Sequence, residues 1–303
     1  MKKIHTYMVE AVLFLLPAVA GAQALPFVAA EFDASSLGKA GADLVETGSV
    51  SNAAFSNAAA IPFAETDLDI AAGYTMWGPT SGNVITASGA YNMRGRLGIA
   101  AGFSYGINPS YDIIGSNGSP SGSFSPTDMQ IGAGVAYRFL DFLSVGANIG
   151  YATSALAEGH SYGAVAADVF AMGSFSGLKV ALGAANIGTA ITSDNGAKFS
   201  LPSSVSIGAG YGRKFAEKHA VDVLLDADYF LEGSIAAALG AEYTFNDLVS
   251  VRAGYRYGGE SPVPQFATVG LGVKWYGIKL NMAYVLSSET MGNTFAIGLG
   301  YCF

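Results

Sequence analysis

The sequence has very few cysteines, few charges and no long hydrophobic run beyond its first 22 residues. The single cysteine, Cys302, excludes an internal disulfide framework. No later stretch reaches the roughly 18 to 20 consecutive apolar residues of a membrane helix, which excludes helical spans. Only 13% of the residues are charged, and the formal net charge of −8 argues against a nucleic-acid partner.

What the sequence has instead is a regular alternation of apolar and small residues. Hydrophobic residues make up 51% of the chain, and 40 residues are glycine. Because successive strand side chains point to opposite faces, this alternation indicates strands with one lipid-facing and one lumen-facing side. In the closing stretch one face carries Phe295, Ile297, Leu299, Tyr301 and Phe303, and the other carries Ala296, Gly298, Gly300 and Cys302. An edge strand this apolar would aggregate in a soluble protein, so we predict that it closes a membrane barrel.

The alternation persists from Asp67 to the end of the chain and gives about fourteen strands, with weaker segments near 68–77, 83–93, 163–173 and 178–188. Short turns alternate with mostly longer links, including those at 108–126 and 189–202. Short periplasmic turns and longer external loops are typical of outer-membrane barrels, and an even strand count puts the N-terminal segment and the C-terminus on the periplasmic side. The predicted fold is all-β, a transmembrane antiparallel β-barrel with an N-terminal plug inside its lumen.

Three regions follow from this interpretation. Residues 1–22 are predicted to be a cleaved signal peptide, since Lys2 and Lys3 precede an apolar core and the small-residue site Ala20-Gly21-Ala22. Residues 23–63 are rich in alanine, serine and glycine and are too few to hold a core of their own, so we predict that they form the plug. Residues 64–303 are predicted to form the barrel in a bacterial outer membrane, in contact with its lipids.

Charged residues on the predicted strands share the lumen face. Slipping the strand at 249–257 by one residue would turn Arg252 and Arg256 into lipid, at roughly 2–4 kcal/mol each near the midplane. Four acidic residues on nearby strands face the same way: Asp222, Asp226, Asp228 and Glu242. We interpret these six residues as an ion-pair cluster, which either locks the plug to the wall or contacts a substrate.

No catalytic constellation is evident. His160 is predicted in an external loop and His219 at a periplasmic turn, which excludes a shared metal site or a histidine-activated nucleophile. We therefore predict a protein that is not an enzyme and needs no cofactor. Aromatic residues near strand ends, among them Trp77 and Trp275, fit interfacial girdles.

Several segments resemble the PorV/PorQ family of outer-membrane proteins. One runs from Gly240 to Asp247 (G-A-E-Y-T-F-N-D) and on through 251–256 (V-R-A-G-Y-R), and another joins 201–203 (L-P-S) to 207–211 (I-G-A-G-Y). Residues 37–42 (L-G-K-A-G-A) are similar to the family's glycine-rich opening, and residues 57–61 (N-A-A-A-I), which begin with Asn57, stand where the family tends to have Asn-Pro-Ala-Gly-Leu. Tyr301 and Phe303 resemble the C-terminal assembly signal of bacterial outer-membrane proteins in general. The resemblance implies a fourteen-stranded barrel of the wider group similar to the fatty-acid transporter FadL.

The resemblance also implies a function, with an alternative. Our leading hypothesis is a protein-binding component of type IX secretion or surface protein assembly, whose partners bind at the extracellular rim. Four apolar residues of the link at 108–126 are the candidate contact: Tyr111, Ile113, Ile114 and Phe124. The alternative is a FadL-like transporter for a hydrophobic small molecule. It predicts an apolar pocket between plug and loops, formed by plug residues such as Leu25, Phe27, Phe32 and Phe55. A third hypothesis is a purely structural barrel that buttresses a larger envelope complex.

Overall fold

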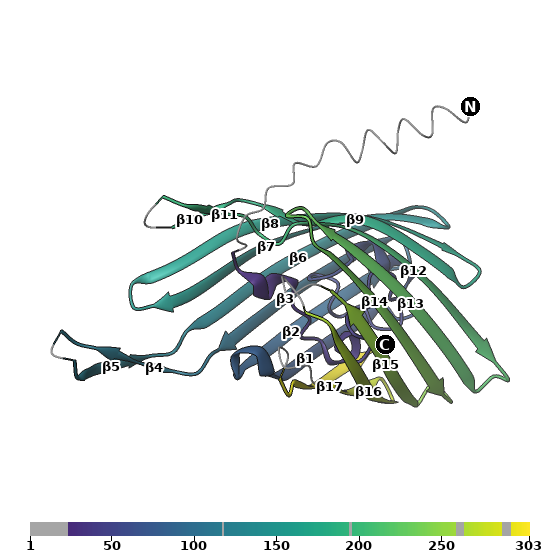
Figure 1. The fold of residues 1–303 in the computed structure, drawn as a ribbon. Coiled ribbons are helices and arrows are strands. Elements are labelled where there is room, and N and C mark those ends of the chain that lie inside the picture. The colour runs from purple at the N-terminus through teal and green to yellow at the C-terminus, as the bar shows by residue number, and fades with distance from the viewer. Residues whose placement is uncertain (1–23, 117, 194–195, 259–263, 287–291) are drawn as a thin grey trace.

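The computed structural model describes residues 24–116, 118–193, 196–258, 264–286 and 292–303. In this part of the chain fourteen strands form one closed antiparallel barrel, which confirms the predicted fold class (Figure 1). They are β1 (Leu68–Trp77), β2 (Gly82–Met93), β3 (Leu97–Ile107), β6 (Thr127–Leu140), β7 (Leu143–Ala157), β8 (His160–Phe175), β9 (Leu178–Gly188), β12 (Ser204–Phe215), β13 (His219–Phe230), β14 (Ile235–Phe245), β15 (Val249–Tyr257), β16 (Phe266–Trp275), β17 (Ile278–Leu286) and β18 (Phe295–Cys302). Among the described residues, no helix is long and apolar enough to cross a membrane. The predicted signal peptide lies outside the described residues.

The barrel closes where β18 pairs with β1. Their register runs from Cys302 opposite Asp69 to Phe295 opposite Met76. Phe303 extends this pairing, because its carbonyl accepts hydrogen bonds from the amides of Asp67 and Leu68 at 2.6 and 3.1 Å. Closure leaves the wall without a free strand edge. The role of Tyr301 and Phe303 as an assembly signal stays a prediction.

The wall has the expected two faces. On β15, Val251 and Tyr255 are 51% and 49% exposed, whereas Arg252 and Arg256 between them are 7% and 8% exposed. Both guanidinium groups therefore point into the lumen, where they avoid the cost of burial in lipid.

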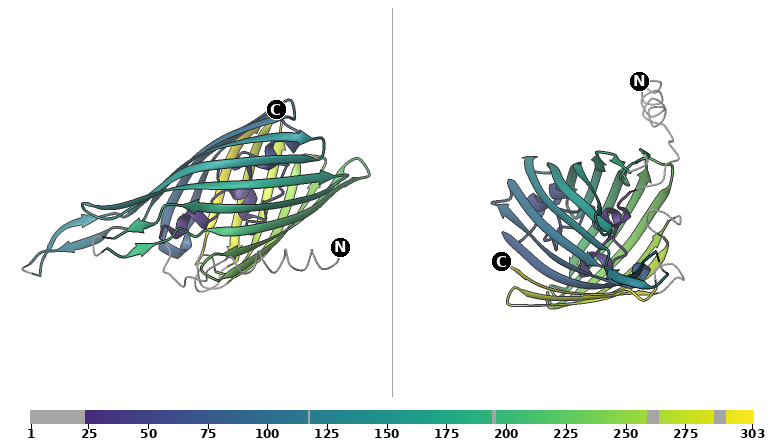
Figure 2. Two further views of the ribbon diagram at one scale, coloured as in Figure 1. Left: turned by 90° about the horizontal axis from the view of Figure 1, so that it is seen from above. Right: turned by 90° about the vertical axis from the view of Figure 1, so that its left-hand side faces the viewer.

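The long links at 108–126 and 189–202 contain hairpins rather than plain loops. β4 (Tyr111–Ile114) pairs with β5 (Pro120–Phe124), and β10 (Ile191–Thr192) pairs with β11 (Lys198–Phe199). The rings of Tyr111 and Phe124 lie opposite each other with centroids 6.0 Å apart, a cross-strand pair of the kind that stabilises hairpins. The β4–β5 hairpin projects beyond the barrel (Figures 1 and 2).

Residues 24–67, which we call the inner segment, lie inside the ring of strands (Figure 2). The segment starts at the loop end of the barrel, where the Ala24 amide donates to the Ser200 carbonyl at 2.9 Å. It finishes at the turn end, where Asn92 Nδ2 donates to the Ala64 carbonyl at 3.0 Å. The expectation that this segment shares the periplasmic end with the C-terminus is therefore wrong for its first residues, because the segment runs the length of the lumen before β1 begins.

Short helical turns give the inner segment its shape: η1 (Pro26–Ala29), α2 (Ala34–Leu37) and η2 (Ala58–Phe63). Asp33 caps α2 by accepting hydrogen bonds from the amides of Ser35 and Ser36, both at 2.9 Å. Asn57 caps η2 through Oδ1, which accepts from the Ala59 amide at 2.8 Å, while its Nδ2 donates to the Leu44 carbonyl at 2.7 Å. Asn57 thus joins two turns of the segment.

Glycines of the wall let the inner segment approach closely. A Cβ atom at Gly254 would lie 2.3 Å from the carbonyl carbon of Lys39, and one at Gly146 would lie 2.5 Å from the amide nitrogen of Ala59. Both neighbours are backbone atoms that cannot rotate away. The small-residue lumen face of the sequence therefore makes room for a second layer of chain.

Candidate ligand-binding site

An apolar cavity lies at the loop end of the barrel, between the inner segment and the loops. It encloses about 670 Å³. Its walls come from η1, from η3 (Gly78–Thr80) and from the loop ends of six barrel strands and both strands of the β10–β11 hairpin. The described lining residues are Ala24, Leu25, Pro26, Phe27, Ala30, Phe32, Trp77, Pro79, Thr80, Val84, Ser104, Gly106, Asn108, Asp128, Ser154, Leu156, Tyr162, Ile191, Ser193, Phe199 and Pro264. Most of these side chains are apolar, so the cavity suits a hydrophobic molecule.

The inner segment forms the inner side of this cavity. Pro26 opens η1, where its missing amide hydrogen costs no helical hydrogen bond. Leu25, 6% exposed, packs in an apolar group with Ile191 and Leu201 from the loop end. Of the four inner-segment residues predicted to form a pocket, Leu25, Phe27 and Phe32 line it.

Phe55, the fourth predicted pocket residue, does not line the cavity. It packs instead against the wall farther from the loops, where a Cβ atom on Gly102 would lie 2.4 Å from its Cε2 atom. The prediction placed it with the other three because sequence alone does not set depth along the lumen.

Trp77, predicted as part of an interfacial girdle, faces the cavity instead. Its ring lies edge-on to Phe32, with centroids 5.1 Å apart. Strand alternation indicates this orientation from the sequence. Trp77 is an even number of residues from Asp69 and Thr75, which are 1% and 0% exposed, so the three share the inner face of β1. The exposed Tyr74 and Met76 lie on its outer face.

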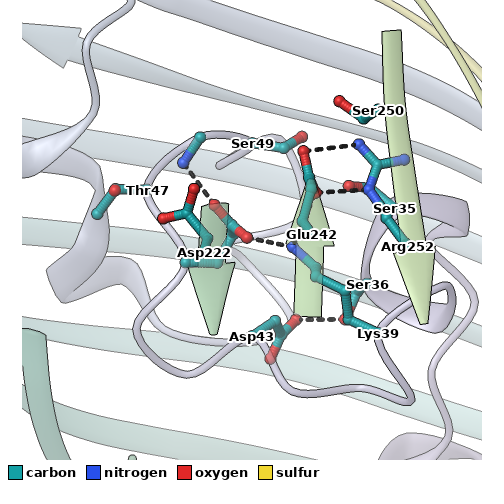
Figure 3. Close-up of polar contacts among 12 residues, drawn as sticks. Ser35, Ser36, Lys39, Asp43, Thr47, Ser49, Asp222, Glu242, Ser250 and Arg252 are labelled. Carbon is teal, nitrogen blue, oxygen red and sulfur yellow. Dashed lines mark hydrogen bonds and ion pairs between the residues drawn. The ribbon is translucent and has the colours of Figure 1, made fainter. Parts of the chain in front are cut away.

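Below the cavity, Lys39 of the inner segment lies in a buried ion network (Figure 3). Its Nζ atom contacts Glu46 and lies 3.8 Å from Glu242 Oε2 on β14. Glu242 Oε2 accepts from Arg252 Nε on β15 at 2.6 Å, and Arg252 Nη1 donates to Asn281 Oδ1 on β17 at 2.8 Å. The network therefore ties the inner segment to three strands of the wall.

The six charged residues predicted as one cluster form two groups along the lumen. Asp222 stands opposite Glu242 in the ladder, and its Oδ1 atom lies 3.9 Å from Lys179 Nζ, so it belongs with the Lys39 network. Nearer the loops, Arg256 Nη2 donates to Asp228 Oδ2 at 2.9 Å. Ion pairs are therefore present among these residues, but they form two separate groups along the lumen.

Asp226 belongs to the second group and contacts the inner segment directly. Its Oδ2 atom accepts from the amides of Asp43 and Leu44 at 2.8 and 2.9 Å. Sequence reasoning missed a comparable contact, in which Lys279 Nζ on β17 contacts Asp69 and donates to Ser49 Oγ at 3.0 Å. These contacts support the interpretation that charged residues hold the inner segment to the barrel wall. That interpretation stays a prediction.

The remaining candidate residues do not line the cavity, although the Tyr111 hydroxyl donates at 2.8 Å to the carbonyl of Leu156, which does. Tyr111, Ile113, Ile114 and Phe124 belong to the β4–β5 hairpin, where Tyr111 and Ile114 are 42% and 58% exposed. His160 begins β8 at the loop end and His219 begins β13 at the turn end, so they stand on opposite sides as predicted. Among the described residues, no group of three or more histidine, cysteine, aspartate or glutamate side chains is placed to hold a metal ion.

The inner segment should respond to pH through Asp43, whose Oδ2 atom accepts from Ser36 Oγ at 2.9 Å. Burial raises the pKa of Asp43 to about 6, against the opposing effects of Ser36 and Lys39. The pKa of Asp43 in the folded protein therefore exceeds its ordinary value of 3.8. As a result, the free energy of unfolding falls as the pH rises from about 4 to 6, and this loss stays constant at higher pH.

Asp43→Asn is therefore expected to stabilise the protein at about pH 8, by up to about 3 kcal/mol, and to have little effect near pH 4. Urea unfolding followed by tryptophan fluorescence at both pH values measures the difference. The same gain at both pH values would show that ionisation of Asp43 is not its source.

No protein-family model and no curated protein matches the chain. Solved structures do: the CymD monoaromatic hydrocarbon channel is 11% identical with a TM-score of 0.62, over 90% of this chain and 97% of that one. The Ralstonia pickettii toluene transporter TbuX is 12% identical with a TM-score of 0.59, over 88% of this chain and 98% of that one. A Pseudomonas aeruginosa FadL homologue is 11% identical with a TM-score of 0.55, over 93% of this chain and 99% of that one. The chain therefore has the fold of FadL-like outer-membrane channels, and its resemblance to the PorV/PorQ family stays a prediction.

Proposed function

We propose that this protein is an outer-membrane channel that takes up a small hydrophobic molecule from outside the cell. The observation that carries the proposal is the apolar cavity of about 670 Å³ beneath the loops. It is the pocket that the transporter hypothesis predicted and the secretion hypothesis did not. The similarity to channels whose names specify toluene and monoaromatic hydrocarbons supports the same choice.

The inner segment makes such a channel gated rather than open. Beneath the cavity the lumen holds α2, η2 and the ion network around Lys39. The ladders between β2, β3 and β6 beside Phe55 are continuous. Passage therefore requires either displacement of the inner segment or opening of the wall.

A protein-binding role in secretion is the second candidate. Its specific support is the β4–β5 hairpin, which projects from the barrel and exposes Tyr111 and Ile114 (Figure 2). The hairpin and the cavity do not share a lining residue among the described ones, so substitutions can separate the two functions.

Trp77 provides a direct test of the cavity, because the chain has only 2 tryptophans. In a Trp275→Phe variant, Trp77 is the sole tryptophan and lines the cavity. We expect bromobenzene to quench its fluorescence saturably, since a heavy atom bound in the cavity lies beside the indole. Adding Phe27→Asp should weaken this quenching at least about tenfold, because it places a charge in the apolar lining.

Two controls make the result specific. Ile114→Asp introduces the same charge at an exposed side chain of the hairpin and should leave the quenching unchanged. A Trp77→Phe variant, whose sole tryptophan is the exposed Trp275, reports partitioning of the probe into detergent. Equal weakening by Phe27→Asp and Ile114→Asp would place the binding site elsewhere and reject the proposal.

A further inference from the structure

A second, polar cavity lies next to the apolar one. It encloses about 130 Å³, and Ala30 lines both cavities. Five carboxyl groups line it: Glu31 and Asp43 from the inner segment, Asp168 from β8, and Asp226 and Asp228 from β13. Among the described lining residues Arg256 is the only cation. We call this space the acidic chamber.

Neutral donors, rather than cations, satisfy most of these carboxyl groups. Glu31 Oε1 accepts from the Asp33 amide at 2.7 Å, and Asp168 Oδ1 accepts from the Asn186 amide at 2.6 Å. Within the described part of the chain, Asp228 is the one of these five that has an ion pair, which it forms with Arg256. The chamber therefore contains more carboxyl groups than cations.

Asp226 carries an acceptor that no described residue uses. The residue is 4% exposed, and its Oδ1 atom has no hydrogen-bond partner in the described part of the chain, whereas Oδ2 accepts two backbone amides. A buried carboxylate oxygen without a donor is costly, so the site is suited to a ligand that supplies one.

The pKa values of the inner-segment carboxyl groups agree with the shortage of cations in the chamber. Burial, followed by repulsion from Asp43 and Asp33, holds the pKa of Glu31 well above its usual range. Burial likewise raises the pKa of Asp43 to about 6. A cation placed among these groups would favour the ionised carboxylates and so lower both pKa values.

The apolar cavity is unfavourable for an anionic ligand. Its described lining contains no lysine, arginine or histidine, and its one charged residue there is Asp128, which accepts from Asn108 Nδ2 at 3.0 Å. A ligand carboxylate would find no cation in the described lining of this cavity and, in that of the chamber beside it, only Arg256, which already pairs with Asp228. A neutral head would leave Asp226 Oδ1 without a charged donor.

We propose that the transported molecule is an amphiphile with a protonated amine, whose apolar chain lies in the apolar cavity and whose ammonium group lies in the acidic chamber beside Asp226. The inference rests on the proposed function and narrows its substrate class. An ammonium group offers three donors and is about the size of a water molecule, roughly 30 Å³ in the liquid, so the chamber has room for it. Charge-assisted hydrogen bonds to carboxylates are the strong ones that would favour this head group.

The test compares three probes with the same chain: octylamine, octan-1-ol and octanoate. Each is titrated calorimetrically into the full protein in a non-ionic detergent at about pH 7.5, with a detergent-only blank for partitioning. We expect octylamine to bind about tenfold more tightly than octan-1-ol, and octanoate to bind more weakly than both. Asp226→Asn should reduce the amine's advantage to about twofold or less while leaving octan-1-ol binding unchanged.

Matched variants keep the outcomes distinct. Asp247→Asn removes the same charge at an exposed turn and should preserve the amine's advantage. Glu31→Gln, on the inner segment, serves as a second chamber variant if Asp226→Asn does not fold. Equal binding of amine and alcohol, or an advantage that survives both chamber variants, would overturn this inference and leave the channel proposal standing. If neither octan-1-ol nor octylamine binds, the channel proposal itself fails.

Discussion

Replacing Lys39 with methionine is expected to lower the free energy of unfolding by about 3–5 kcal/mol, the usual cost of removing one partner from a buried ion pair. The Lys39 side chain is 1% exposed and contacts Glu46, with Glu242 at 3.8 Å. Methionine fills a similar volume but leaves the half-buried Glu46 without its direct cation. Urea unfolding of the detergent-solubilised protein, followed by tryptophan fluorescence, measures the loss.

An exposed ion pair supplies the control for this prediction. Lys214 Nζ lies 2.6 Å from Asp247 Oδ2, and these side chains are 50% and 66% exposed. Lys214→Met should therefore cost less than about 1 kcal/mol. Adding Glu46→Gln to Lys39→Met should recover part of the loss, since it removes the charge left unpaired. A cost for Lys39→Met as small as that of Lys214→Met would show that the network around Lys39 does not stabilise the fold.

A single methyl group on Gly254 is expected to displace the inner segment and open the lumen. The added Cβ atom would lie 2.3 Å from the carbonyl carbon of Lys39 and 2.6 Å from the amide nitrogen of Ala40, so the segment's backbone has to move. We expect Gly254→Ala to cost about 1–3 kcal/mol or more and to raise ion conductance in planar bilayers above that of the wild type. Single-channel recording measures the conductance.

Gly298 on β18 provides the matched control, because it also faces the lumen but has space. A Cβ atom there would lie 3.6 Å from the nearest neighbour, the Ala34 Cβ atom, which is an ordinary contact. Gly298→Ala should leave both stability and conductance close to wild type. If Gly254→Ala behaves in the same way, the inner segment is not what closes the lumen beneath the cavity.

The barrel was predictable from the sequence because its causes are local. Alternation along each strand and alternating link lengths depend on residues close together in the chain. The inward direction of Arg252 and Arg256 was predictable for a related reason, since lipid penalises the other register. Hairpins within the longer links escaped prediction, because pairs such as Tyr111 and Phe124 close on each other outside the membrane and follow no lipid-facing pattern.

The site was less predictable, because its contacts join distant parts of the chain. Lys39 and Glu242, or Lys279 and Asp69, are about 200 residues apart, and no periodicity links them. Three of the four predicted pocket residues line the cavity, yet the wall residues opposite them come together only through closure of the barrel. Trp77 is the exception, since strand parity alone places it on the inner face.

The inner segment precedes β1 in the chain and runs from the loop end to the turn end, so the wall has to close around it. The seam between β1 and β18 therefore completes a wall that surrounds the segment. Lys279, one strand from that seam, reaches Asp69 on the wall and Ser49 on the inner segment together. Because β1 follows the segment at the turn end, complete release of the segment from the closed barrel would draw residue 24 down the whole lumen, a far larger movement than a local displacement within it.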